Sequence, residues 1–183
     1  MVRESMVIII ATTALLGLGC VQHSSTKLSD SESPASSGYV LHSAEAETLV
    51  GGPGLMKIFT SPATGSSHFA MGTQELRSGS SIPMHRHEHA DEAFFVHDGH
   101  GIGVVGETRK SLSKGDAAYI PRGVWHGFET DTESLNVVWF IAPPGLEEFF
   151  RETRVPPGTP LRNLTPEQME KIGLKHGLEK KPE

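Results

Sequence analysis

The sequence predicts an all-β protein, a double-sheet jelly-roll barrel followed by short C-terminal helices. Two observations indicate this class. Between Leu49 and Ile141, short apolar runs alternate with turn-forming clusters, and the 20 glycines and 12 prolines of the chain fall largely between such runs. A chain of 183 residues is also long enough for one domain with a real core and too short for two. About eight such strands would close into a barrel whose mouth accommodates a small ligand.

The individual elements follow from these runs and from helix-start signals near the end of the chain. The end of the chain carries the helix signals. Leu146, Phe149 and Phe150 share one face of a short helix, and the sequence starting at Thr165 has the form of a capping box with proline at the first helical position. A turn is expected at Asp98–Gly99. The expected strands cover Leu55–Phe59, Phe69–Leu76, Ile102–Val105, Ala117–Ile120 and Leu135–Ile141.

The N-terminal segment has the pattern of an export signal. Residues Met6–Leu18 are almost wholly apolar but too few to span a bilayer core as a helix, which needs about 20 residues. Cys20 stands where such a signal is cut, and it resembles the lipid acceptor of a bacterial lipoprotein. We therefore expect export to the periplasm or cell envelope as a lipoprotein, with a membrane anchor at Cys20. Soluble secretion after cleavage at the same bond and an uncleaved anchor are the alternatives.

These patterns divide the chain into four segments. A signal peptide is expected over residues 1–19 and a Ser-rich tether over residues 20–48, because the tether has too few apolar residues to offset its ordering entropy. The barrel domain is expected over residues 49–145 and a helical tail over residues 146–183. The single cysteine excludes an internal disulfide.

A group of histidines and a glutamate predicts a metal site. Side chains two apart on a strand share a face, so His85 and His87 point the same way with Cα atoms roughly 6–7 Å apart. Glu92 opens the apolar run Ala93–Val96 and can enter from the neighbouring strand. His126 would supply a fourth ligand from a distant strand. Three imidazoles and a carboxylate suit a borderline divalent ion and make a calcium site a poor match.

These residues stand within two segments that resemble the signature motifs of the cupin superfamily, G-x5-H-x-H-x4-E-x6-G and G-x5-P-x-G-x2-H-x3-N. The resemblance covers about residues 50–145 and implies the double-stranded β-helix, or cupin, barrel. Thr130 replaces the final asparagine of the second motif. The matched positions are Gly79, His85, His87, Glu92 and Gly99 in the first motif and Gly115, Pro121, Gly123 and His126 in the second.

The resemblance, together with a tail similar to that of quercetinase-like single-domain cupins, implies a metal-dependent oxidoreductase of dioxygenase type. One divalent transition-metal ion, Fe, Mn, Ni, Co, Cu or Zn, would meet a small aromatic or enolic substrate in the barrel. Glu92 would bind the ion at rest and act as the catalytic base when substrate arrives. Two other functions remain open, a non-catalytic binding or sensing module at the cell envelope and a metal-dependent lyase or isomerase on the same fold.

Further residues are candidates for the substrate pocket. Phe94 and Val96 share the face of Glu92, and Phe128 shares that of His126, although ordinary core packing explains all three equally well. His68 would face the barrel lumen if strand alternation extends to it, and Tyr119 would act as a proton donor or base.

Net charge and its distribution limit the partners. The formal net charge is −6 and the basic residues form no stripe, so nothing favours nucleic acid as a partner. The expected partner is a small-molecule substrate or ligand. The resemblance to cupins also suggests pairing of two copies into a homodimer.

Overall fold

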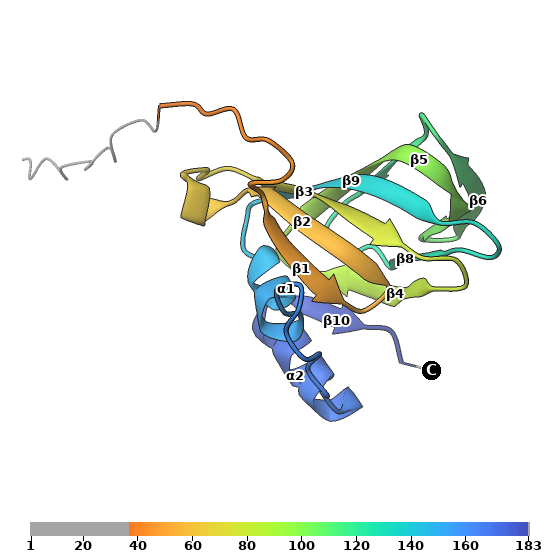
Figure 1. Ribbon diagram of the computed structural model, residues 1–183. Helices are drawn as coiled ribbons and strands as arrows, with labels where there is room; N and C mark the ends of the chain where they lie inside the picture. Colours follow the sequence, from red (N-terminus) through yellow and green to blue (C-terminus); the bar gives the residue numbers. More distant parts are fainter. Residues whose placement is uncertain (1–36, 183) are drawn as a thin grey trace, which may run out of the picture. The chain divides into compact units, whose positions relative to one another are not determined.

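The structure, a computed structural model, describes residues 37–182. The expected signal peptide, the acceptor Cys20 and most of the expected tether lie outside the described residues. Within residues 37–182, no helix is both long and apolar enough to cross a membrane. Figure 1 shows strands making up most of this part of the chain, with short helices toward its C-terminal end.

The elements of residues 37–182 are antiparallel strands, with helices at three places. In chain order they are β1 (Glu47–Gly51), β2 (Gly54–Thr60), the 3-10 turn η1 (Pro62–Thr64), β3 (Ala70–Leu76), β4 (Ser81–His87), β5 (Asp91–Val105), β6 (Thr108–Ser113), β7 (Ala117–Ile120), β8 (His126–Glu129), β9 (Leu135–Ala142), α1 (Glu147–Thr153), α2 (Pro166–Lys175) and β10 (Leu178–Lys180).

The strands form the two sheets of a jelly roll, as the sequence predicts. Hydrogen bonds connect them in the order β1-β2-β3-β9-β5-β8-β4-β10, with β6 and β7 also paired to β5. The first half of β5 pairs with β7 and β9 in one sheet, and its second half pairs with β6 and β8 in the other. A single long strand therefore passes from one sheet into the next and holds the two together (Figure 1).

The expected turn at Asp98–Gly99 is wrong, because both residues lie within β5, a continuous strand of 15 residues. The register against β9 shifts between Val96 and Asp98, and Gly99 has a φ of +84°. A side chain at Gly99 would stand 2.0 Å from the carbonyl oxygen of Ser134. The glycine thus permits a bulge that bends the strand from one sheet into the other.

The core lies between the two sheets and follows the two-residue period of the strands. In β9, alternate side chains are buried, and Trp139 and Ile141 are at most 1% exposed. The ring of Trp139 occupies the space over Gly72, where a Cβ would come within 2.3 Å of it. This close approach requires glycine at that position of β3.

The tail contains the two expected helices and, in addition, a short strand. The capping box at Thr165 is confirmed, since its side chain accepts a hydrogen bond from the Gln168 N–H and the Gln168 side chain bonds back to the Thr165 N–H. The last described residues, however, form β10, which pairs with β4. Residues Leu178–Lys180 were not predicted as a strand because a run this short carries no periodic pattern.

Helices α1 and α2 link the two edges of the sheet. In Figure 1 they lie beside β1 and β10, and α1 contacts both β1 and α2 while α2 contacts β10. Arg151 of α1 binds the carboxylate of Glu47 on β1 with an N–O distance of 2.7 Å. Phe149 and Phe150 pack against the core from the same helix. The tail therefore closes the space between the two edge strands.

Candidate metal centre

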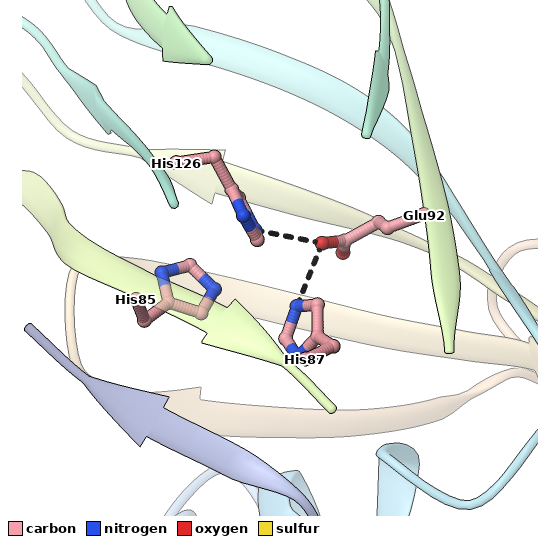
Figure 2. A group of neighbouring side chains, drawn as sticks. All are labelled: His85, His87, Glu92 and His126. Atoms are coloured by element: carbon pink, nitrogen blue, oxygen red, sulfur yellow. Dashed lines mark hydrogen bonds and ion pairs between the residues drawn. The ribbon is translucent and has the colours of Figure 1, made fainter. Parts of the chain in front are cut away.

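Three strands and both sheets position the four predicted ligands. His85 and His87 stand two apart on β4, and His126, the first residue of β8, is the direct cross-strand partner of His85. Glu92 comes from the opposite sheet, where the start of β5 pairs with β7 and β9. The side chains meet between the sheets, and Figure 2 shows the Glu92 carboxylate facing the imidazoles of His87 and His126.

The four side chains form one compact and buried group. One possible ligand atom from each lies within 4.8 Å of the others. The imidazole centroids of His85 and His126 are 4.1 Å apart, and that of His87 lies 4.9–5.0 Å from both. All four residues are between 0% and 8% exposed. A set of three imidazoles and one carboxylate at this separation fits a divalent transition-metal ion.

Backbone carbonyls orient two of the imidazoles. The Nδ1 atom of His85 is 2.8 Å from the Pro83 carbonyl oxygen, and that of His126 is 2.9 Å from the Val124 carbonyl oxygen. Each carbonyl requires a proton on Nδ1, so the hydrogen-bond network assigns a tautomer whose Nε2 lone pair is free. This is the arrangement that metal-binding histidines adopt.

The contact between His126 and Glu92 points to a cation between them. Nε2 of His126 lies 3.1 Å from Oε2 of Glu92, and Nε2 of His87 lies 2.9 Å from the same oxygen. A neutral imidazole carries one N–H, and that of His126 is directed to Val124. The Nε2 lone pair and the carboxylate oxygen would repel each other unless a proton or a metal ion is shared between them.

Electrostatics keep the group in the form that binds metals. Burial, followed by the nearby imidazoles of His126 and His87, lowers the pKa of His85 from 6.5 to about 3. Burial by itself would raise the pKa of Glu92, but the short contacts with the imidazoles of His126 and His87 outweigh it and lower the value to about 2. At neutral pH the site therefore presents an uncharged His85 and an ionised Glu92.

Sequence comparison places these residues in a known family. A family model described as a cupin domain matches residues 72–143, a span that includes all four side chains. An uncharacterized protein of Streptomyces coelicolor is 30% identical over 77 residues, which is 42% of this chain and 72% of that relative. The chain belongs to the cupin superfamily. Its two histidine motifs are thus cupin motifs in both sequence and structure.

This cupin is also similar to a characterised enzyme. The quercetin 2,3-dioxygenase of Bacillus subtilis is 28% identical over 126 residues, 69% of this chain. The match spans 36% of the Bacillus protein, so this chain corresponds to about a third of that relative's length.

Solved structures support the cupin fold. KdgF from Halomonas superposes with a TM-score of 0.53 at 21% identity, covering 58% of this chain and 94% of its own. An RmlC-like cupin from Shewanella frigidimarina gives 0.54 at 18% identity, with 61% and 96% covered. The polyketide cyclase RemF from Streptomyces resistomycificus gives 0.53 at 20% identity, with 73% and 92% covered. At these identities the likeness concerns the fold.

The second cupin motif supports the first through backbone contacts. The N–H of Gly123 donates to the carbonyl oxygen of His87 over 2.7 Å, and Gly123 has a φ of +79° that favours glycine. Thr130, which departs from the motif, accepts a hydrogen bond from the Ser80 N–H and lies 2.6 Å from the Arg77 carbonyl oxygen. This side chain joins the end of β8 to the turn before β4.

The candidate pocket residues separate into two groups. Phe94, Val96 and Phe128 are buried inside the barrel, and the rings of Phe94 and Phe128 are 4.5 Å apart. His68 was expected in the lumen, but it is exposed in a bend because β3 begins at Ala70. Tyr119 was expected in the pocket too, yet it is 65% exposed because the alternation that buries Ile120 turns Tyr119 outward. Neither side chain lies at the centre.

A cavity of about 310 Å³ adjoins the group on the side of His87. Part of its lining comes from the C-terminal tail. The tail reaches the site through the pairing of β10 with β4, a long-range contact that leaves no periodic signal in the sequence. The lining residues are His87, His89, Ala90, Pro143, Pro144, Gly145, Leu146, Leu174, Lys175, His176 and Gly177.

Proposed function

We propose that this cupin is a metal-dependent oxidoreductase of dioxygenase type that acts on a small aromatic or enolic substrate. The ion would be held by His85, His87, Glu92 and His126. The observation that carries the proposal is the 3.1 Å contact between Nε2 of His126, whose Nδ1 is directed to the Val124 carbonyl, and the Glu92 carboxylate, a contact that a shared metal ion accounts for. The metal could be Fe, Mn, Ni, Co, Cu or Zn, since this ligand set suits all of them.

An ion bound by these four groups would supply open coordination positions at which a substrate oxygen and dioxygen meet. The chain's own residues provide orientation and proton transfer. Carbonyl oxygens of Pro83 and Val124 fix two imidazole rings. The buried rings of Phe94 and Phe128 follow Glu92 and His126 by two residues on the same strands and pack 4.5 Å apart. An aromatic or conjugated substrate would match this apolar interior better than a sugar.

Glu92 is the candidate catalytic base. Its low pKa keeps the carboxylate ionised, so it can accept a proton from an enol or phenol. The same low pKa makes it a weak base while His87 and His126 both bind its Oε2 atom. A substrate that displaces the carboxylate from these contacts would raise its basicity at the moment when proton transfer is needed.

Similarity supports this choice over other cupin activities. The relative with quercetin 2,3-dioxygenase activity aligns over 69% of this chain. Because that alignment covers 36% of the enzyme, the flavonol substrate of the relative is one member of the substrate panel rather than the assigned substrate.

The ligand set is tested by elemental analysis of the full chain purified without added metal. We expect about one transition-metal ion per chain, and we expect His85→Ala, His87→Ala and His126→Ala each to lose most of it. Glu92→Gln should retain more metal than these variants but lose activity. His89→Ala is the matched control, because His89 is 75% exposed in the neighbouring loop. Full metal content in His87→Ala would overturn the ligand set.

The activity is tested by oxygen uptake with a panel of catechols, flavonols and enediols. Uptake that requires both the metal and His85 supports the dioxygenase proposal. Thermal stabilisation by one of these compounds with no oxygen uptake and no product would identify a binding module instead. Conversion of a compound without oxygen uptake would identify a lyase or isomerase.

A further inference from the structure

The cavity beside His87 is bounded by three separate parts of the chain. The β4–β5 turn contributes His89 and Ala90, the β9–α1 turn contributes residues 143–146, and the end of α2 with its connection to β10 contributes residues 174–177. Its volume of about 310 Å³ is at the lower end of the range for small-molecule sites.

The tail wall of this cavity is held in place by backbone contacts. The carbonyl oxygen of Gly177 accepts a hydrogen bond from the Glu88 N–H over 2.8 Å, and β10 continues directly into the pairing with β4. A Cβ at Gly177 would lie 3.2 Å from the imidazole of His89. The wall is therefore pre-formed, which reduces the entropy lost when a ligand binds.

His87 connects the cavity with the metal centre. Its Nε2 faces Glu92, whereas its buried Nδ1 has no hydrogen-bond partner among residues 37–182. The other two imidazoles of the centre donate Nδ1–H to carbonyl oxygens. With a metal ion on Nε2, Nδ1 of His87 would carry the ring proton and would be a buried donor without a partner, which is unfavourable. Because His87 also lines the cavity, a small shift of the ring or of its neighbours would let an oxygen acceptor on a bound ligand reach Nδ1.

The chemistry of the lining indicates what that ligand carries. Its titratable groups are His87, His89, Lys175 and His176, and it contains no carboxylate. Glu152, outside the lining, pairs with Lys175 and with His176 and so holds both at the wall. The rest of the lining is apolar, with two prolines, an alanine and two leucines. Nitrogen donors beside an apolar surface suit a small carboxylate with an apolar body.

We propose that this tail-walled cavity binds the carboxylate of a small apolar acid next to His87, and that Leu174 and Lys175 determine which acids fit. The proposal rests on the proposed function in that the bound acid would be the substrate of the metal centre. Lys175 would attract the carboxylate, His87 would donate to it, and Leu174, 57% exposed at the tail wall, would contact the apolar body.

The test uses phenylpyruvate as the probe and phenylacetone, which lacks the carboxylate, as its neutral analogue. Binding is measured by calorimetry on the full chain, both treated with chelator and reloaded with zinc, and the metal content of every variant is recorded. Leu174→Trp should weaken phenylpyruvate binding at least about tenfold without loss of metal. Leu161→Trp is the control, because Leu161 is also exposed in the tail but lies outside the cavity.

A second pair of variants tests the charge. Lys175→Ala should weaken binding of phenylpyruvate several-fold and leave that of phenylacetone unchanged, while Lys171→Ala, outside the lining, should change neither. Equal affinity of the wild type for both probes, or wild-type affinity in Leu174→Trp and Lys175→Ala, would overturn the proposal. So would absence of saturable phenylpyruvate binding in both forms of the wild type. A wild-type chain that binds no metal but still prefers phenylpyruvate to phenylacetone would contradict the proposed function and leave the cavity proposal standing.

Discussion

At the scale of single residues, fixed spacing predicted which four side chains lie together. His85 and His87 could be placed on one face because the two-residue period of a strand holds wherever the strand holds, and the structure brings them together with Glu92 and His126. The same rule gave the wrong position for His68, because that residue lies two positions before the first residue of β3, where the alternation of the strand does not apply. For Tyr119 the strand was predicted correctly, but nothing in its four residues indicated which face was inward.

His85 also makes a prediction for stability. Its pKa in the folded chain is about 3, against an ordinary value of 6.5, because burial and then His126 and His87 disfavour its charged form. Below about pH 6.5 the unfolded chain binds a proton at this site and the folded chain does not. The free energy of unfolding of chelator-treated protein should therefore decrease as the pH falls from 6.5 toward 5, by at most about 1.4 kcal/mol per pH unit from this group.

Urea denaturation at pH 7, 6 and 5 measures this slope. His85→Gln removes the titrating group and should flatten the dependence over that range. His89→Gln should keep the wild-type slope, because its side chain is 75% exposed. The pH range in which His85 alone accounts for the slope ends near pH 4.5. Below that pH, protonation of Glu92, whose pKa is also lowered by folding, decreases the free energy of unfolding further. A slope in His85→Gln as steep as that of the wild type would show that burial of this imidazole is not its source.

At the scale of elements, strands with clear alternation were predictable and junctions between elements were not. The strand over Ala117–Ile120 was predicted with its observed bounds, and that starting at Leu135 ends one residue beyond the expected end. Asp98–Gly99 has the composition of a turn, yet it lies within β5, because pairing with β9 and β8 on either side outweighs the local preference. β10 escaped prediction because its partner lies about 90 residues earlier in the chain.

The bend in β5 can be tested with two glycine substitutions. Gly99→Ala would introduce both a strained φ of +84° and a Cβ 2.0 Å from a backbone oxygen. Gly106→Ala shares the positive φ, +59°, but its nearest neighbouring atom would be 3.9 Å away. We expect Gly99→Ala to lower the free energy of unfolding by at least about 2 kcal/mol more than Gly106→Ala, because it adds overpacking to strain.

Chemical denaturation of both variants gives this difference. A similar loss in both would mean that the chain shifts to accommodate the Cβ and that backbone strain alone sets the cost. Metal content should also fall in Gly99→Ala, since the bend sets the path of β5 between Glu92 in one sheet and the β8 pairing in the other.

At the scale of the whole molecule, the four candidate ligands come from both sheets, and the tail pairs with the strand that carries two of them. The histidines belong to one sheet and Glu92 to the other, so the group forms only when the two sheets face each other. β10 extends the histidine-bearing sheet, and the helices α1 and α2 connect it back to β1. The barrel was predictable from the motifs, whereas the role of the tail in closing it was not, because the contacts between edges arise only in three dimensions.

Cys20 leads to the last prediction, which concerns where the molecule resides. We propose that Cys20 is lipid-modified and that the mature chain fractionates with membranes. Several acyl chains on one residue are needed for stable anchoring, since a single chain gives marginal membrane affinity. Cys20→Ser should leave the chain unprocessed or release it, and moving the cysteine with Cys20→Ser and Ser24→Cys should not restore anchoring, because the acceptor must stand at the cleavage site. Intact mass and membrane fractionation measure both properties. A wild-type chain that is wholly soluble and carries an unmodified Cys20 would leave ordinary secretion as the explanation of the apolar N-terminal run.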